Sequence, residues 1–164
     1  MIIAAADGSA IGNPGPTGWA WYVDEEHWAA GAFPTGTNNI GELTAVAELL
    51  EATAHVGQAL HIVADSRYVI DSVTSWMPGW KRRGWKKADG KPVKNVDLMR
   101  RIDALMQGRE VTFEWVRGHA GHPLNEKVDA LAQAQARAVA DCATRRGPGW
   151  PGQVACDIGD DTLF

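Results

Sequence analysis

The chain has 164 residues, of which 45% are hydrophobic, and it carries a formal net charge of −4. This length suits one globular domain with a sizeable core. No apolar run approaches the roughly 20 residues that span a bilayer, and the first residues lack the pattern of a secretory signal. The two cysteines, Cys142 and Cys156, form neither a disulfide framework nor a zinc pattern. We therefore expect a cytoplasmic protein with no membrane partner, and we take it to be a monomer.

The charge of the chain is unevenly distributed. Segment 81–94 contains seven of the 16 basic residues and one of the 20 acidic ones, so its net charge is +6 while the remainder carries −10. A basic run is often only a solvated face. Here Trp80 precedes the segment and Trp85 lies within it, and exposed indoles stack well on sugars or bases. The segment therefore predicts contact with nucleic acid.

The N-terminal third of the chain predicts three strands followed by a helix. Residues 2–6 form an apolar run, residues 19–24 alternate, and residues 27–33 form a third strand-like run. Turns rich in Gly, Asn and Pro separate these runs, which favours antiparallel pairing. Helical spacing then appears at Leu43, Val46, Ala47 and Leu50.

The middle of the chain predicts another strand and two helices. An apolar strand at 60–64 is followed by helical spacing over 69–76, which Pro78-Gly79 is expected to end. Beyond the basic segment, Asn95 is a good N-cap for a helix that Gly108 ends. The expected order up to this point is three strands, helix, strand, helix, helix.

The last part of the chain predicts one more strand, one more helix and a tail. Residues 111–115 alternate as a strand, and Pro123 fits the first turn of a helix. Five strands with these helices indicate a mixed α/β sheet flanked by helices. We assign residues 1–143 to this domain and residues 144–164 to a flexible, Gly/Pro-rich acidic tail.

Four carboxylates occupy positions that a hydrophobic core does not explain. Asp7 and Asp65 are each expected to end a strand, so both emerge at one sheet edge if these strands are neighbours. Glu42 opens the first helix, and Asp129 lies early in the last one. Each alone is most simply a solvated or helix-terminal acid. Together they would repel one another, and they therefore predict a site for a hard cation such as Mg²⁺ or Mn²⁺.

These residues lie within an ordered series of motifs that closely resembles ribonuclease H type 1. The matching motifs are Asp7-Gly8-Ser9, Gly12-Asn13-Pro14-Gly15-Pro16, Thr37-Asn38-Asn39, Glu42-Leu43, Ala64-Asp65-Ser66, Trp80-Lys81-Arg82-Arg83, Gly118-His119-Ala120-Gly121-His122-Pro123, Asn125-Glu126 and Asp129. The resemblance covers residues 1 to about 143. It implies a ribonuclease H-like fold, with three antiparallel strands followed by two parallel ones.

The resemblance also implies an activity, namely endonucleolytic hydrolysis of the RNA strand of RNA–DNA hybrids, leaving 5′-phosphate and 3′-hydroxyl ends. By matching position, Asp7 would bridge two Mg²⁺ ions, for which Mn²⁺ can substitute. Asp129 would join Asp7 on the ion that activates water. Glu42 and Asp65 would hold the ion at the leaving 3′ oxygen. His119, on a loop with two glycines, would assist proton transfer or product release.

Substrate contacts are implied for both strands of the hybrid, which is the expected partner. The positions matching contacts to RNA 2′-hydroxyls are Gly8, Ser9, Asn13 and Asn38. The positions matching contacts to the DNA strand are Trp76 and Trp80 for stacking on deoxyriboses and Thr37 and Asn95 for a phosphate pocket. The positions matching the family's basic protrusion are Lys81, Arg82 and Arg83.

The sequence departs from the family pattern at a few substrate-facing positions. Ile40-Gly41 precedes Glu42 where a basic or polar residue and Met are more usual. Gly79 stands where a polar side chain often contacts the nucleic acid. These departures concern the tightness of substrate binding and leave the four carboxylates untouched.

Two other functions are compatible with such a site. A transposase, integrase or Holliday-junction nuclease shares carboxylates on a similar sheet, but generally lacks the basic protrusion and the Gly-His-Ala-Gly loop. A hybrid-binding module without activity would be expected to lack a carboxylate, whereas all four positions are filled here. Separately, the acidic tail 157–164 ends in Phe and resembles the C-terminal peptides by which bacterial single-stranded-DNA-binding proteins recruit partners, which suggests weak protein docking.

Overall fold

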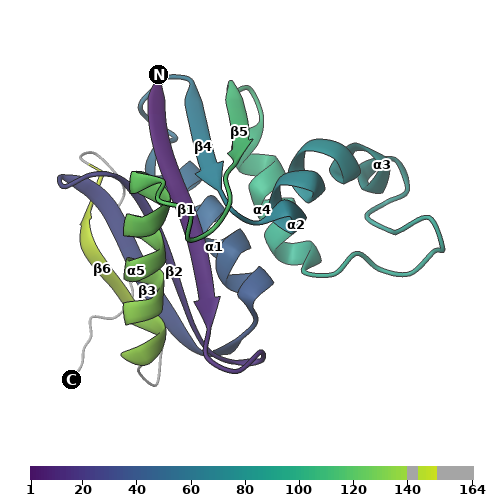
Figure 1. The fold of residues 1–164 in the computed structure, drawn as a ribbon. Coiled ribbons are helices and arrows are strands. Elements are labelled where there is room, and N and C mark those ends of the chain that lie inside the picture. The colour runs from purple at the N-terminus through teal and green to yellow at the C-terminus, as the bar shows by residue number, and fades with distance from the viewer. Residues whose placement is uncertain (140–143, 151–164) are drawn as a thin grey trace.

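The computed structural model describes residues 1–139 and 144–150 of the chain. These residues form one six-stranded sheet with the strand order β5-β4-β1-β2-β3-β6 (Figure 1). The strands are β1 (Ile2–Ala10), β2 (Gly15–Asp24), β3 (His27–Gly36), β4 (Leu60–Ala64), β5 (Val111–Trp115) and β6 (Thr144–Gly149). Strands β1 to β3 are antiparallel, whereas β4 pairs parallel to β1 and β5 pairs parallel to β4. The mixed sheet expected from the sequence is thus confirmed.

The expected count of five strands was one too low. Strand β6 pairs antiparallel with β3 at the sheet edge, with Ala32 opposite Thr144 and Trp28 opposite Gly149. Its Gly- and Pro-rich sequence is typical of a linker, and we assigned it to the tail for that reason. An edge strand tolerates such residues because only one of its sides must supply ladder hydrogen bonds. The rest of the predicted tail, residues 151–164, including the proposed docking peptide, lies outside the described residues.

The helices cover both faces of the sheet. They are α1 (Asn38–Ala52), α2 (Arg67–Asp71), the π-helical turn η1 (Ser72–Trp76), α3 (Met77–Arg82), α4 (Val96–Met106) and α5 (Pro123–Arg137). Helix α5 lies on one face of the sheet and α1 on the other (Figure 1). Strand β1 is sandwiched between them, so its core residues are the small Ala4, Ala5 and Ala6, all fully buried. Among the described residues, no helix is both long and apolar enough to cross a membrane.

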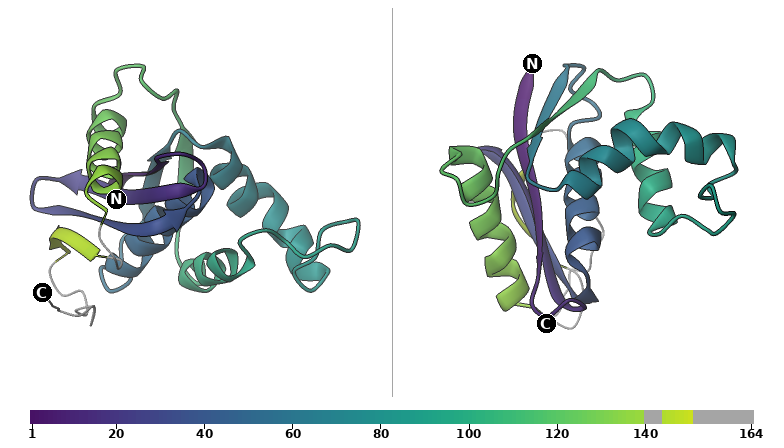
Figure 2. Two further views of the ribbon diagram at one scale, coloured as in Figure 1. Left: turned by 90° about the horizontal axis from the view of Figure 1, so that it is seen from below. Right: turned by 45° about the vertical axis from the view of Figure 1, so that its right-hand side comes forward.

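The helical run from α2 to α3 projects away from the sheet, together with the loop that follows it (Figure 2). We expected Pro78-Gly79 to end this helix, and that expectation was wrong. The chain passes through η1 and continues as α3, with Pro78 in the first turn of that helix. A proline is tolerated there because the first N–H groups of a helix have no intrahelical partner.

Candidate active site and nucleic-acid interface

The register of β1 and β4 brings the first two predicted carboxylates together. The parallel pairing of these strands extends only to Ala5 opposite Val63. Strand β1 continues beyond that point with β2 alone, so Asp7 lies within the strand, opposite Ala20. Asp65 follows β4 directly. Both carboxylates therefore lie just past the end of the parallel ladder, although Asp7 does not end its strand as we expected.

Glu42 reaches the same place from the start of α1. The helix begins at Asn38, with Thr37 as its N-cap accepting a hydrogen bond from the Ile40 N–H at 3.1 Å. A side chain on Gly8 would overlap the backbone of Gly41 and Glu42, so only a glycine there permits β1 and α1 to pack this closely. The first turns of α1 are thereby pressed onto β1 beside Asp7.

Asp7, Glu42 and Asp65 form one compact acidic cluster. A carboxylate oxygen from each lies within 4.8 Å of the other two. Asp7 is only 2% exposed, and its Oδ2 has no hydrogen-bond partner among the described residues, whereas Oδ1 accepts from the Gly8 N–H at 2.9 Å. Burial, followed by the Asp65 and Asp129 charges, raises the pKa of Asp7 from 3.8 to about 8. Burial and the Asp7 charge likewise raise the pKa of Glu42 well above its ordinary range.

Asp129 completes the predicted set from α5. Its charge is the second cause, after burial, that raises the pKa of Asp65, so the two carboxylates act on one another. Its Oδ2 accepts a hydrogen bond from the Gln133 Nε2 at 2.9 Å. The structure thus gathers four carboxylates from two strands and two helices, as the sequence predicted.

Two residues that support Asp65 are not among the predicted site residues. The side chain of Asn125, 1% exposed, hydrogen-bonds to Asp65 and opposes the rise of its pKa, while the Asn125 Oδ1 has no partner among the described residues. The Trp115 Nε1 donates to the Asp65 carbonyl at 3.1 Å, and the Arg67 guanidinium lies 4.2 Å from the centre of the Trp115 ring. The sequence did contain one indication that Asn125 is buried, because it lies three residues before Val128 and so on the same face of the helix.

His119 lies at the mouth of this cluster. It is 77% exposed, and its Nδ1 is 3.8 Å from the Asp129 Oδ2. Its φ of 57° is in the left-handed region, which places it on an irregular loop rather than in a helix or strand. A side chain on the neighbouring Gly118 would come within 2.8 Å of the Asp65 Oδ2, so this loop packs directly against the acidic cluster. His122 is the N-cap of α5 and accepts from the Asn125 N–H.

The acidic cluster fits a divalent metal ion. Buried carboxylates with raised pKa values repel one another, and a cation would remove both the repulsion and the need for a proton. The unpaired Asp7 Oδ2 offers a free ligand atom, and an all-oxygen set suits Mg²⁺ or Mn²⁺. Asp7, Glu42 and Asp65 are the residues that would hold such an ion, with Asp129 close by.

A groove lined by aromatic and basic side chains lies on the projecting helices. A cavity of about 400 Å³ is lined by Tyr68, Trp76, Trp80, Arg83, Lys87, Ala88, Val93 and Lys94. The rings of Trp76 and Trp80 are 6.0 Å apart, and Trp76 is 46% exposed. Of the two predicted stacking residues, Trp76 is therefore accessible on the surface that Arg83 also lines, whereas Trp80 is only 9% exposed and packs in the hydrophobic core.

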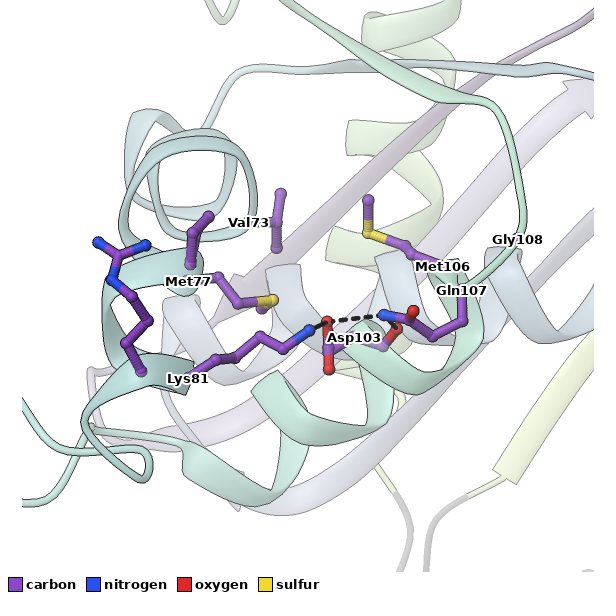
Figure 3. A pocket seen from close by; sticks show the side chains of 9 residues that line it. Val73, Met77, Lys81, Asp103, Met106, Gln107 and Gly108 are labelled. Carbon is purple, nitrogen blue, oxygen red and sulfur yellow. Dashed lines mark hydrogen bonds and ion pairs between the residues drawn. The ribbon is translucent and has the colours of Figure 1, made fainter.

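Lys81 and Arg82 lie apart from that groove. They line a second cavity, of about 480 Å³, between α3 and the end of α4 (Figure 3). There the Lys81 Nζ lies 3.0 Å from the Asp103 Oδ1. Arg83 is thus the member of the predicted basic trio that the structure places beside the tryptophans.

The remaining predicted substrate residues occupy two further places. Asn38 and Asn13 interlock near the end of β1, since the Asn38 N–H donates to the Asn13 Oδ1 at 3.0 Å and the Asn38 Oδ1 accepts from Ala10 at 2.8 Å. Gly8 and Ser9 precede this point on β1. Asn95 stands at the N-cap of α4, but its side chain does not cap the helix as we expected. Its backbone is left-handed, with φ 56°, and its Nδ2 donates to the Tyr68 hydroxyl at 3.2 Å.

A mixed sheet with a carboxylate cluster at its centre and a basic aromatic groove beside it has the features of a metal-dependent nuclease. A family model described as RNase H matches residues 1–137. The chain therefore belongs to the RNase H family, a metal-dependent family.

Curated relatives and solved structures agree with this assignment. Ribonuclease H of Tropheryma whipplei (strain Twist) is 53% identical over 153 residues, covering 91% of this chain and 93% of that protein. Ribonuclease H of Alkalilimnicola ehrlichii is 51% identical over 134 residues, covering 80% and 91%. Among solved structures, LC9-RNase H1, a type 1 RNase H, is 30% identical with a TM-score of 0.70, covering 89% of this chain and 78% of that one.

The protein is accordingly an endoribonuclease that hydrolyses the RNA strand of RNA–DNA hybrids. This outcome favours the first of the functions considered from the sequence over the transposases, integrases and junction nucleases.

Proposed function

We propose that this chain cleaves hybrids with two Mg²⁺ ions, held by Asp7, Glu42, Asp65 and Asp129, and that Mn²⁺ can replace them. The observation that carries the proposal is the cluster of three carboxylate oxygens within 4.8 Å, with one buried oxygen left unpaired. Asp7 would hold both ions, together with Asp129 at one of them and with Glu42 and Asp65 at the other. When bound, such ions activate a water molecule and stabilise the leaving 3′ oxygen of a phosphodiester.

The protein's own groups position the metal ligands and move protons. Asn125 and Trp115 hold the side chain and the carbonyl of Asp65, so that its carboxylate stays beside Asp7. His119 is exposed on a loop and lies near Asp129, which suits a group that takes up a proton from the reacting water or transfers one to the product. Cleavage in this way leaves a 5′-phosphate and a 3′-hydroxyl.

Recognition of the hybrid is proposed to use both sides of the metal centre. Gly8, Ser9 and the interlocked Asn13 and Asn38 lie where RNA 2′-hydroxyls can be read, which distinguishes RNA from DNA. On the other side, the exposed Trp76 offers a ring face for deoxyriboses, and the largely buried Trp80 ring packs 6.0 Å from it. A solved ribonuclease H1, LC11-RNase H1, has been determined in complex with an RNA/DNA hybrid and shares the fold, with a TM-score of 0.62 at 20% identity.

The phosphate pocket is proposed at Thr37 and Asn95. The Thr37 hydroxyl oxygen already accepts a hydrogen bond from Ile40, but the hydroxyl can still donate to a phosphate. The Asn95 amide donates to Tyr68 and keeps a second N–H for the same purpose. The basic segment, including Lys81 and Arg82, adds salt-dependent attraction to the phosphate backbone.

Calorimetric titration with Mg²⁺ alone tests the metal site. Wild type should bind Mg²⁺, and Asp65→Asn should bind it at least about tenfold more weakly, since one charged ligand is lost. Asp97→Asn, an exposed position on α4, is the matched control and should bind like wild type. Equal binding by wild type and Asp65→Asn would remove Asp65 from the ligand set.

Three further expectations remain predictions. A monomer would elute from a sizing column with an apparent mass near 17.7 kDa. A cytoplasmic location is supported by the sequence features alone and would be checked by cell fractionation. Docking through residues 157–164 would be dismissed if their deletion left partner pull-down unchanged.

A further inference from the structure

The helical run from α2 to α3 is held in one orientation by its contact with α4. Val73, Met77 and Lys81 point to the cavity at the end of α4, where Lys81 pairs with Asp103 (Figure 3). Because these contacts fix the rotation of α3 about its own axis, they also determine which side chains lie on the side of the helix that faces away from this cavity. That side carries Trp76, Trp80 and Arg83.

The π-helical turn η1 has an identifiable cause. The Met77 N–H donates to the carbonyl of Ser72, five residues earlier, which widens the helix at this point. Pro78 follows directly; it has no N–H, and its ring would crowd the carbonyl four residues earlier in a regular α-helix. The turn ends at Trp76, which is left half exposed beside Trp80.

Gly79 is the unusual residue of α3. It lies within the helix, where glycine is less favourable than alanine. A Cβ at this position would lie 3.3 Å and 3.5 Å from the two terminal nitrogens of Arg83. The Arg83 guanidinium therefore lies across the helix, over the place that a side chain at 79 would occupy.

We propose that Gly79 is a positioning residue for Arg83. Its missing side chain leaves room for the guanidinium at the groove that Trp76 and Trp80 also line, so that one surface offers the exposed Trp76 ring for sugars and a forked cation for the adjoining phosphate. The Arg83 Nε also donates to the Lys86 carbonyl at 3.3 Å, which restrains the side chain in this direction. The inference rests on the proposed hybrid-binding role of this groove.

The proposal predicts opposite effects on stability and on binding. Gly79→Leu replaces glycine with a good helix former, so the thermal midpoint should stay the same or rise. The same substitution displaces the guanidinium, so hybrid binding should weaken. If Gly79 had no role beyond its place in the helix, Gly79→Leu would not weaken hybrid binding while it keeps or raises the thermal midpoint.

The experiment measures binding of a labelled RNA–DNA hybrid by fluorescence anisotropy in EDTA, so that no strand is cleaved. The proteins are wild type, Gly79→Leu, Arg83→Met, the double variant, and the control Ala104→Leu on an exposed face of α4. Gly79→Leu and Arg83→Met should each bind about fivefold more weakly and lose about one unit of salt slope. The double variant should bind like Arg83→Met alone, because Gly79 acts only through Arg83.

Other outcomes would overturn the proposal in distinguishable ways. Wild-type affinity in Gly79→Leu, or losses that add in the double variant, would show that Gly79 does not act through Arg83. A lower melting temperature of Gly79→Leu would indicate misfolding, and Gly79→Ala then decides, with a smaller loss of affinity expected at unreduced stability. Failure of the wild-type protein to bind the hybrid would instead refute the proposed function, and this inference with it.

Discussion

Replacing Asp7 by asparagine should stabilise the metal-free protein, and by more at neutral than at acidic pH. Burial raises the pKa of Asp7 from 3.8 to about 8. Between these values the folded chain keeps a proton that the unfolded chain has released, so stability falls as the pH rises. At about 1.4 kcal/mol per pH unit, wild type should lose roughly 2 to 3 kcal/mol of unfolding free energy between pH 5 and pH 7 through Asp7. Asparagine has no such proton to lose.

Urea unfolding in EDTA, followed by circular dichroism at both pH values, measures this difference. The quantity to compare is the unfolding free energy of Asp7→Asn minus that of wild type, in which the titration of groups distant from Asp7 cancels. Glu42 does not cancel, because, besides burial, the Asp7 charge raises its pKa, and its change adds to the difference in the same direction. The control Glu110→Gln, at an exposed position, should show no pH-dependent difference. A gain from Asp7→Asn that is equal at pH 5 and pH 7 would refute the reasoning, because it would show that Asp7 does not retain its proton in the folded protein.

Three further substitutions separate catalysis from binding. Asp65→Asn should abolish cleavage while the protein still folds and binds the hybrid, and substantial residual turnover would contradict the proposed ligand set. His119→Ala should slow turnover by roughly 10²-fold, the lower range for a lost acid–base group, and an unchanged rate would leave it a simple loop residue. Trp76→Ala should weaken hybrid affinity by about tenfold, as expected for one lost stacking contact, with little change in kcat. An unchanged affinity would exclude Trp76 from the interface.

Much of the sheet and the acidic cluster could be predicted because both depend on local patterns. The apolar runs gave five of the six strands and their order along the chain. Asp7 and Asp65 each follow an apolar run, so pairing of the two strands was enough to bring them together. Glu42 and Asp129, each early in a predicted helix, were added because four carboxylates that no core explains indicate a cation site, and the family resemblance then implied their separate roles. Which helix faces pack on β1 is not encoded in any short window.

The features that escaped prediction depend on contacts between distant segments. Asn125 has a polar side chain, which normally indicates an exposed position, yet it is only 1% exposed and lies against Asp65. The side chain of Asn95 has the chemistry of an N-cap, but it donates to the Tyr68 hydroxyl from another helix. Pro78 is a helix breaker by propensity. Here the helical run continues past it through a π turn, because the run packs against α4. Strand β6 could not be predicted from its own sequence, because it is a strand only through its pairing with the edge of β3.

The most direct test of the account uses a labelled RNA–DNA hybrid, with duplex DNA, duplex RNA and single strands as controls. Each is incubated with the protein in Mg²⁺, with and without EDTA. The account predicts cleavage of only the RNA strand of the hybrid, with 5′-phosphate ends, and complete loss of cleavage in EDTA. An intact hybrid in both Mg²⁺ and Mn²⁺, from a sample shown to be folded, would contradict it.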